Sequence, residues 1–186
     1  MARKKEFDIS QAAYKAADVF RKKGFEGTSM QDLVDVLNLS RSSIYETFGN
    51  KKELYLVALD HYTNEVDEMT SVLYEDGPPR MVLDKFFDKI IEHNEKESCF
   101  MVQASLEMMT HLDVMDRVSR NNLKREKAFL YLLERALSDG VLTENQDLSI
   151  LSKYLVNVTN GLSVTSRTTD KPALHQIVKM SLYFLK

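Results

Sequence analysis

The sequence has little of what several protein classes require. Its 186 residues include one Cys, three Pro, six Gly and no Trp. A single cysteine, Cys99, excludes an internal disulfide framework and is typical of a reducing cytoplasm. A chain with so few Gly and Pro rarely builds a sheet of many strands, because each connection needs a turn. The composition therefore favours an all-α fold.

Long apolar runs and targeting segments are also missing. No stretch approaches the roughly 18 apolar residues of a membrane helix. The opening residues, MARKKEFDIS, carry a basic run with no apolar stretch behind it, so we expect no signal peptide. We predict a cytoplasmic protein with no membrane partner.

Enzyme motifs are absent as well. The sequence contains no GxGxxG, no phosphate-binding loop, no GxSxG and no HExxH. The four histidines, His61, His93, His111 and His175, fit no zinc spacing, and no Glu-x-x-His pair suits a di-iron bundle. We therefore predict that the protein is not an enzyme and has no cofactor or metal.

The charge is unevenly distributed along the chain. Residues 1–54 hold 10 Lys and Arg against 8 Asp and Glu, whereas the remainder holds 15 against 20. The N-terminal part is therefore mildly basic and the C-terminal part acidic. This small bias agrees with a front end that meets a polyanion.

Apolar residues recur every three to four positions through most of the chain, which indicates helices. Gly24, Gly49 and Asp139-Gly140 are suited to helix ends. No strand-like alternation longer than a few residues and no internal repeat is present. The predicted helices cover about residues 9–23, 29–37, 41–48, 51–74, 80–94, 98–111, 114–138, 147–167 and 172–185.

The segment SRSSIYETFGNKKEL, residues 40–54, is too polar for a buried helix yet contains a large Ile, Tyr and Phe. On a helical wheel with Ile44 at zero, Phe48 falls at about 40°, so these two define an inward face. Ser42 and Glu46 fall at about 160° and 200°, on the opposite side. The helix is therefore held by two apolar residues and presents short polar groups outward.

A second short helix precedes this one. Thr28 and Gln31 have the spacing of a capping box at its start, and Ser40 is a suitable N-cap for the helix that follows. Asn38 tolerates the left-handed conformation that a tight turn between them demands. Two short helices joined in this way are the build of a helix-turn-helix, whose second helix enters the DNA major groove.

The chemistry of the outward face fits that role. Arg can bond guanine bidentately, and Glu can accept from the cytosine amino group. A helix that starts after Asn50 presents free N–H groups beside Lys51, where a DNA phosphate can dock. The expected DNA contacts are Thr28, Ser29, Arg41, Ser42, Ser43, Tyr45, Glu46, Thr47, Asn50 and Lys51.

The run TSMQDLVDVLNLSRSSIYETFGNKKEL, with AAYKAADVFRKKGFEG upstream, resembles the N-terminal domain of the tetracycline-repressor (TetR) family of bacterial regulators. The resemblance implies a three-helix DNA-binding head, a helical ligand-sensing body and a homodimer on a roughly palindromic operator. Asn38 stands where the family usually has Gly, and Ser42 where it has a small residue, often Gly. Because Ser42 is still small, we expect the helix to enter the groove but to read different bases.

Aromatic and Met-rich segments of the body can line an adaptable apolar pocket or simply form a core. The resemblance implies some pocket among them for a small, largely apolar effector. Cys99 is either a thiol sensor, a pocket wall or a small core residue, and a free Cys is usually buried core. The candidate pocket residues are Tyr62, Phe86, Phe87, Ile90, Cys99, Gln103, Phe129 and Asn157.

Two surfaces of the body have further interpretations. The last two predicted helices are apolar on wide faces that one body cannot easily bury, so we predict a four-helix dimer interface, two helices from each chain. A basic stripe on the long helix is either a second phosphate contact or a solvated face, and we favour the solvated face. The stripe consists of Arg117, Arg120, Lys124 and Lys127.

The sequence therefore predicts an all-α regulator of about nine helices. Residues 1–50 form a three-helix helix-turn-helix head, and residues 51–186 form a ligand-sensing and dimerising bundle. Its function is that of a ligand-responsive repressor, released from a palindromic double-stranded DNA operator by a small molecule. The alternatives are a helical-bundle ligand-binding protein or enzyme without DNA binding, and a family member that acts only through protein partners.

Overall fold

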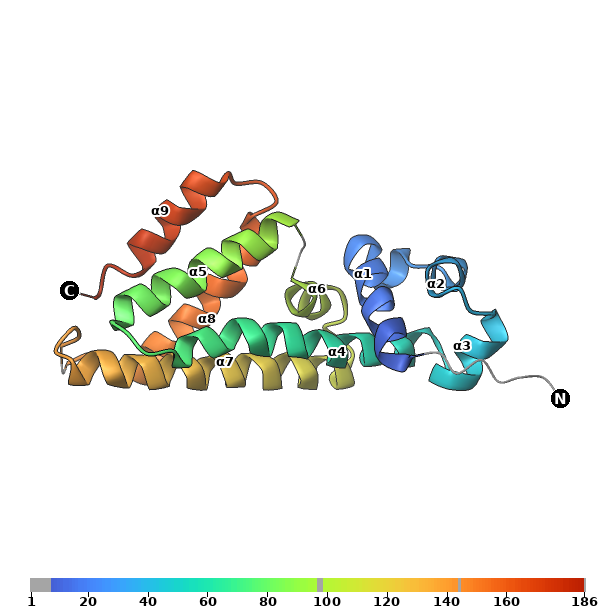
Figure 1. Ribbon diagram of the computed structural model, residues 1–186, viewed down its shortest axis with the longest axis horizontal. Helices are drawn as coiled ribbons and strands as arrows, with labels where there is room; N and C mark the ends of the chain where they lie inside the picture. The colour runs from blue at the N-terminus through green and yellow to red at the C-terminus, as the bar shows by residue number, and fades with distance from the viewer. Residues whose placement is uncertain (1–7, 97–98, 144, 186) are drawn as a thin grey trace.

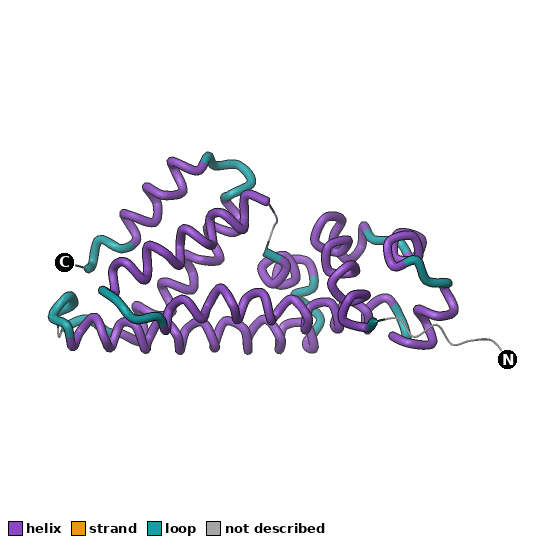
Figure 2. Tube along the Cα trace, viewed as in Figure 1, coloured by secondary structure: helices purple, strands orange, loops and turns teal. Residues whose placement is uncertain are grey.

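A computed structural model describes residues 8–96, 99–143 and 145–185. This part of the chain contains only helices, turns and loops (Figure 2), which confirms the all-α prediction. The nine α-helices and one 3-10 helix are α1 (Ile9–Gly27), α2 (Met30–Leu37), α3 (Arg41–Phe48), α4 (Lys51–Ser71), η1 (Val72–Tyr74), α5 (Pro79–Lys96), α6 (Phe100–Glu107), α7 (Leu112–Ser138), α8 (Leu148–Thr165) and α9 (Lys171–Ser181).

The molecule is elongated, with α1 to α3 at one end and α5, α8 and α9 at the other (Figure 1). Helix α4 connects the two ends, and α7 runs beside it. Ion pairs join the two long helices on their outer side, between Arg117 and Asp60 and between Lys124 and Asp67. Three of the four basic-stripe residues thus pair with carboxylates, since Arg120 pairs with Asp116. This favours the solvated-face interpretation of that stripe.

Local signals in the sequence explain the first helix boundaries. Asp8 caps α1 by accepting from the backbone N–H groups of Ser10 and Gln11. Gly24 has φ 76° and ψ 170°, so the regular helix stops there as predicted and a short continuation completes α1. Asn38 ends α2 with φ 53° and ψ 41°, the left-handed conformation expected of it.

The predicted capping box is wrong by one residue. Ser29, not Thr28, is the N-cap of α2, and its partner at the third helical position is Asp32 rather than Gln31. Thr28 instead follows the last residue of α1. The predicted Ser40 cap of α3 is confirmed, because Ser40 accepts from the Ser43 N–H. Asn50 caps α4 in the same way by accepting from the Glu53 N–H.

The buried residues form two clusters. The first joins α1, α2 and α3 to most of α4, to α6 and to the start of α7, with Phe20, Ile44 and Tyr55 fully buried. The second joins η1, α5, the rest of α7, α8 and α9. The described helices include none long and apolar enough to span a membrane.

Candidate nucleic-acid interface and cavity

Helix α3 has the two faces that the helical wheel predicts. Ile44 and Phe48 are buried, at 0% and 7% exposure, on the side of α3 that packs against α2 and α4. Tyr45 is 44% exposed. Arg41, Ser42, Glu46 and Thr47 are also exposed, and Ser43 is half-buried. The outward face is therefore largely open to solvent and consists of polar side chains, most of them short.

Three serine hydroxyls lie together at the start of α3. The Ser40 oxygen is 2.9 Å from the Ser42 oxygen and 2.8 Å from the Ser43 oxygen. It also accepts from the Ser43 N–H at 3.1 Å. Because these side chains are short, the backbone at the start of α3 can come close to the base edges in a DNA groove.

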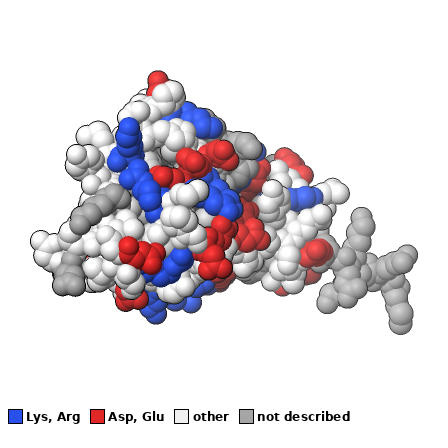
Figure 3. Space-filling model, turned by 60° about the vertical axis from the view of Figure 1, so that its left-hand side comes forward, with Lys and Arg blue, Asp and Glu red and all other residues white. Residues whose placement is uncertain are grey.

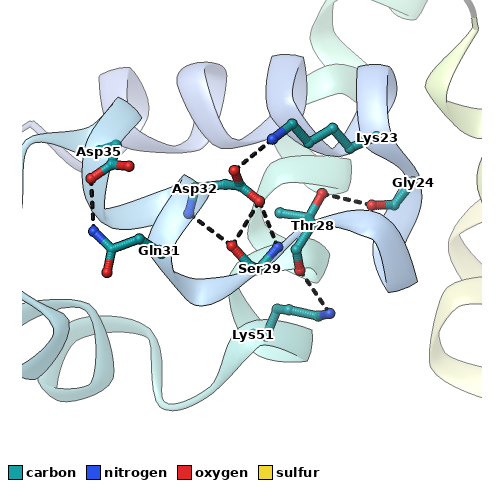
Figure 4. Close-up of polar contacts among 8 residues, drawn as sticks. All are labelled: Lys23, Gly24, Thr28, Ser29, Gln31, Asp32, Asp35 and Lys51. Atoms are coloured by element: carbon teal, nitrogen blue, oxygen red, sulfur yellow. Dashed lines mark hydrogen bonds and ion pairs between the residues drawn. The ribbon is translucent and has the colours of Figure 1, made fainter.

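Figure 4 shows the corner between α1, α2 and the start of α4. The Thr28 hydroxyl is buried and donates to the Gly24 carbonyl at 2.6 Å, so the structure does not place it on the surface. Lys51 donates to the Thr28 carbonyl at 3.0 Å and lies 4.3 Å from the centroid of the Phe25 ring. Both side chains thus stabilise the corner where α1, α2 and the start of α4 meet. Ser29 and Asn50, by contrast, are exposed.

Asp32 holds the start of α2. Its carboxylate accepts from the Ser29 backbone N–H and hydroxyl, both at 2.8 Å, and pairs with Lys23 at 2.5 Å. The bond from Lys23 and the two from Ser29 lower the pKa of Asp32 from 3.8 to about 2. The carboxylate is consequently ionised at any physiological pH.

A carboxylate of α6 bonds to the backbone at the end of α1. Glu107, the last residue of α6, accepts from the Phe25 N–H at 2.8 Å and from the Glu26 N–H at 3.2 Å. A Cβ at Gly24 would lie 2.5 Å from its Oε1 atom, so only glycine leaves room for this contact. We name this set of contacts the Glu107 clasp. The sequence gives no local sign of it, since the partners are more than 80 positions apart.

The same residue lines a cavity of about 330 Å³ between α6 and the end of α8. Its walls mix apolar side chains with a few polar ones. The lining residues are Cys99, Val102, Gln103, Leu106, Glu107, Ser163, Val164 and Arg167.

The structure places only two of the candidate pocket residues, Cys99 and Gln103, at this cavity. Tyr62 is buried nearby in the first cluster and bonds the His93 ring nitrogen at 3.0 Å. Asn157 is exposed on α8. The remaining four candidates pack against one another in the second cluster, as core residues do: Phe86, Phe87, Ile90 and Phe129.

The histidines make ordinary structural contacts where the structure describes them. His175 lies 3.2 Å from Asp88, and His61 packs edge-on against Tyr14. No group of three or more His, Cys, Asp or Glu residues within the described ranges is arranged to hold a metal ion.

Comparison with known proteins decides the family. The sequence profile described as "Bacterial regulatory proteins, tetR family" matches residues 15–58, from α1 into α4. An uncharacterised HTH-type transcriptional regulator of Bacillus subtilis, YezE, is 30% identical over 193 aligned positions, covering all of both chains. The chain belongs to the TetR family.

Other transcriptional regulators are similar over most of their length. The HTH-type transcriptional repressor ComR of Escherichia coli is 23% identical, over 89% of this chain and 82% of its own. The regulator CifR, in a cysteine mutant complexed with a 26-bp operator DNA, is 25% identical with a TM-score of 0.83, covering 97% and 98% of the two chains. The predicted helix-turn-helix head and helical body are confirmed. TetR-family proteins are transcriptional regulators and not enzymes.

Proposed function

We propose that this TetR-family regulator is a repressor that binds a palindromic operator as a homodimer and leaves it when a small effector binds. The observation that carries the proposal is the outward face of α3, which stays exposed while Ile44 and Phe48 are buried beneath it. The repressor role follows from steric logic, because an unliganded dimer on a promoter blocks polymerase.

Within the head, the exposed side chains divide into two roles. Arg41 and Glu46 have the donors and acceptors that read guanine and cytosine edges. Tyr45, Ser29, Thr47 and the N–H groups that follow Asn50 contact phosphates. Thr28 and Lys51 act indirectly, by holding the corner between α1, α2 and α4 in place.

The homodimer forms through α8 and α9. Several large apolar side chains on these helices, or just beyond the end of α9, are exposed although their neighbours are buried. Met180 and Tyr183 are 76% and 89% exposed. A face of this kind fits the four-helix interface of a symmetric dimer. The exposed set is Ile150, Tyr154, Val164, Ile177, Met180 and Tyr183.

The effector site is the cavity between α6 and α8. Its apolar wall of Val102, Leu106 and Val164 suits a largely apolar molecule, and Cys99 serves as a wall residue. Glu107 belongs both to the cavity and to the Glu107 clasp, so an effector that shifts α6 also shifts the head. Coupling of this kind is typically worth about 1–3 kcal/mol, or a several-fold to hundredfold change in operator affinity.

A gel-shift titration with DNA from upstream of the protein's own gene tests the function. We expect saturable binding that survives excess non-specific competitor and weakens steeply as salt is raised. Helix-bundle enzymes and carriers would give no such band. Binding that competitor DNA of unrelated sequence removes completely would contradict the proposal.

A further inference from the structure

The middle of α7 buries two polar side chains on one face. Asn121 and Arg125 are four residues apart, so they lie one above the other, and each is only 3% exposed. Every other arginine of α7 reaches the surface of the molecule at least in part. Burial lowers the pKa of Arg125, and the nearby Cys99 and Tyr62 act in the opposite direction. An arginine nonetheless stays protonated in proteins, so a positive charge lies inside the body.

The surroundings of Arg125 do not neutralise this charge. Its Nη1 donates to the Asn160 side-chain oxygen at 3.2 Å, and its Nε has no hydrogen-bond partner. Both polar atoms of the Asn121 side chain are also unpartnered. Among the side chains that the structure describes, which do not include those of residues 95–98, no carboxylate pairs with Arg125. A neutral amide satisfies one donor of the guanidinium and leaves its charge uncompensated.

The contrast with the other arginines of the helix is informative. Arg117 forms a bidentate contact with Asp60, at 2.7 and 2.8 Å, and Arg120 pairs with Asp116. These arginines lie partly or largely in solvent, where pairing contributes little. The buried arginine is the one that needs a counter-ion, because an unpaired charge in a low-dielectric interior is costly. Buried water can satisfy N–H groups but supplies no negative charge.

Arg125 lies close to the proposed effector cavity. Its partner Asn160 and the cavity residue Ser163 are three positions apart on α8, about 4.5 Å along the helix axis. Cys99, another cavity residue, lies near enough to influence Arg125. Asn94 donates to the Ser163 hydroxyl at 3.2 Å, and both residues are buried, so polar side chains continue inward from the cavity wall.

We propose that Arg125 binds a carboxylate group and that the effector is an organic acid. The acid group accepts from the Nε and a terminal nitrogen of Arg125, the fork that matches a carboxylate, and from the Asn121 amide. The apolar body extends past Cys99 and Ser163 to the wall formed by Val102, Leu106 and Val164. This inference rests on the proposed effector role of the cavity and adds a single anionic group to the largely apolar effector.

The test is binding of defined acids to the free protein, followed by the rise in thermal midpoint and by calorimetric titration. The probes are butanoate, hexanoate, octanoate and benzoate, each beside its neutral primary amide, with inorganic phosphate as a plain anion. We expect at least one acid to bind and raise the midpoint while its amide does not. Truncating one side of a buried charge pair costs affinity, so Arg125→Met should weaken binding about 30-fold or more.

Three variants make the result specific. Arg120→Met removes a surface arginine of the same helix and should leave acid binding unchanged. Arg167→Met removes the exposed arginine at the cavity itself, and we expect a smaller effect than that of Arg125→Met. Without ligand, Arg125→Met should be at least as stable as the original protein, because methionine carries no buried charge.

Several results would overturn the proposal. These are binding of none of the acids, equal binding by Arg125→Met, loss of binding only in Arg167→Met, or an equal response to phosphate alone. A marked loss of stability in unliganded Arg125→Met would assign the arginine a structural role instead. Since no DNA is present, acid binding without operator binding would contradict the proposed repressor function and leave this inference standing.

Discussion

At the scale of single residues, the account depends on which side of α3 each side chain occupies. The wheel placed Ile44 and Phe48 inward, and both are buried. That orientation was predictable because it follows from helical periodicity alone. The positions of the Thr28 and Lys51 side chains were not predictable, since their partners are set by the fold of the head. Thr28 bonds to the Gly24 carbonyl, and Lys51 contacts the Phe25 ring and the Thr28 carbonyl.

Arg41 and Tyr45 should affect DNA binding in different ways. Arg41→Ala should cost about 1–3 kcal/mol on the preferred operator and broaden the set of sequences bound. Tyr45→Phe removes one hydroxyl and should weaken binding to all sequences by about 1 kcal/mol. Titrations against a set of operator variants at fixed salt measure both effects. Tyr74→Phe, at an exposed tyrosine of the body, is the control, and a matching loss there would contradict the assignment.

Asp32 gives the head a defined response to acid. Its pKa is about 2 in the folded protein, below the usual 3.8, because Lys23 and Ser29 bond the ionised form. A lowered pKa means that this stabilisation is fully present above about pH 4 and is lost as the pH falls towards 2. Urea unfolding followed across that range should therefore show a smaller loss of stability with acid in Asp32→Asn than in the original protein. Identical pH profiles would refute this role.

At the scale of elements, α6 packs between α1 of the head and α7 of the body. Its last residue forms the Glu107 clasp, and its side chains wall the cavity. Helix boundaries were close to those predicted, since caps and glycines act locally. The residues that line the cavity could not be predicted in this way, because a phenylalanine that lines a pocket and one that fills a core look alike in sequence. Phe86, Phe87 and Phe129, which the sequence left as pocket candidates, are core residues.

Loss of the Glu107 clasp should loosen the end of α1. In Glu107→Ala the Phe25 and Glu26 N–H groups lose their acceptors, so their hydrogen exchange should quicken by about tenfold, the equivalent of one hydrogen bond. Operator affinity should fall as the head becomes less fixed. Glu134→Ala on α7 is the matched control, because that exposed side chain has no hydrogen bond or ion pair with any described residue. Unchanged exchange in Glu107→Ala would show that the clasp does not hold the head.

At the scale of the whole molecule, the two ends differ in what they offer to partners. The face of the molecule drawn in Figure 3 carries Lys and Arg among Asp and Glu, with no broad patch of one sign. Such a surface does not favour binding of a polyanion. The apolar side chains of α8 and α9 are the better candidate for contact with a second copy, and the division into residues 1–50 and 51–186 stays a prediction.

Acidic substitutions on α9 should separate the dimer. Met180→Asp or Ile177→Asp places a charge where we expect apolar contact, and should weaken association by about 2 kcal/mol or more. Leu112→Asp makes the same change at an exposed residue outside α8 and α9 and should have no effect. Sedimentation at micromolar concentration gives the measurement. A monomeric original protein, or dimers in every variant, would contradict the interface.

Selection of bound sequences from a random DNA pool tests the central claim, that the exposed face of α3 reads DNA in a symmetric dimer. We expect an enriched palindrome whose half-sites lie about 34–36 Å apart, or a multiple of that distance, one for each α3 helix. The same selection with Arg41→Ala should lose preference at a base pair in each half-site. A pool that shows no enrichment, or an enriched site without symmetry, would contradict the account.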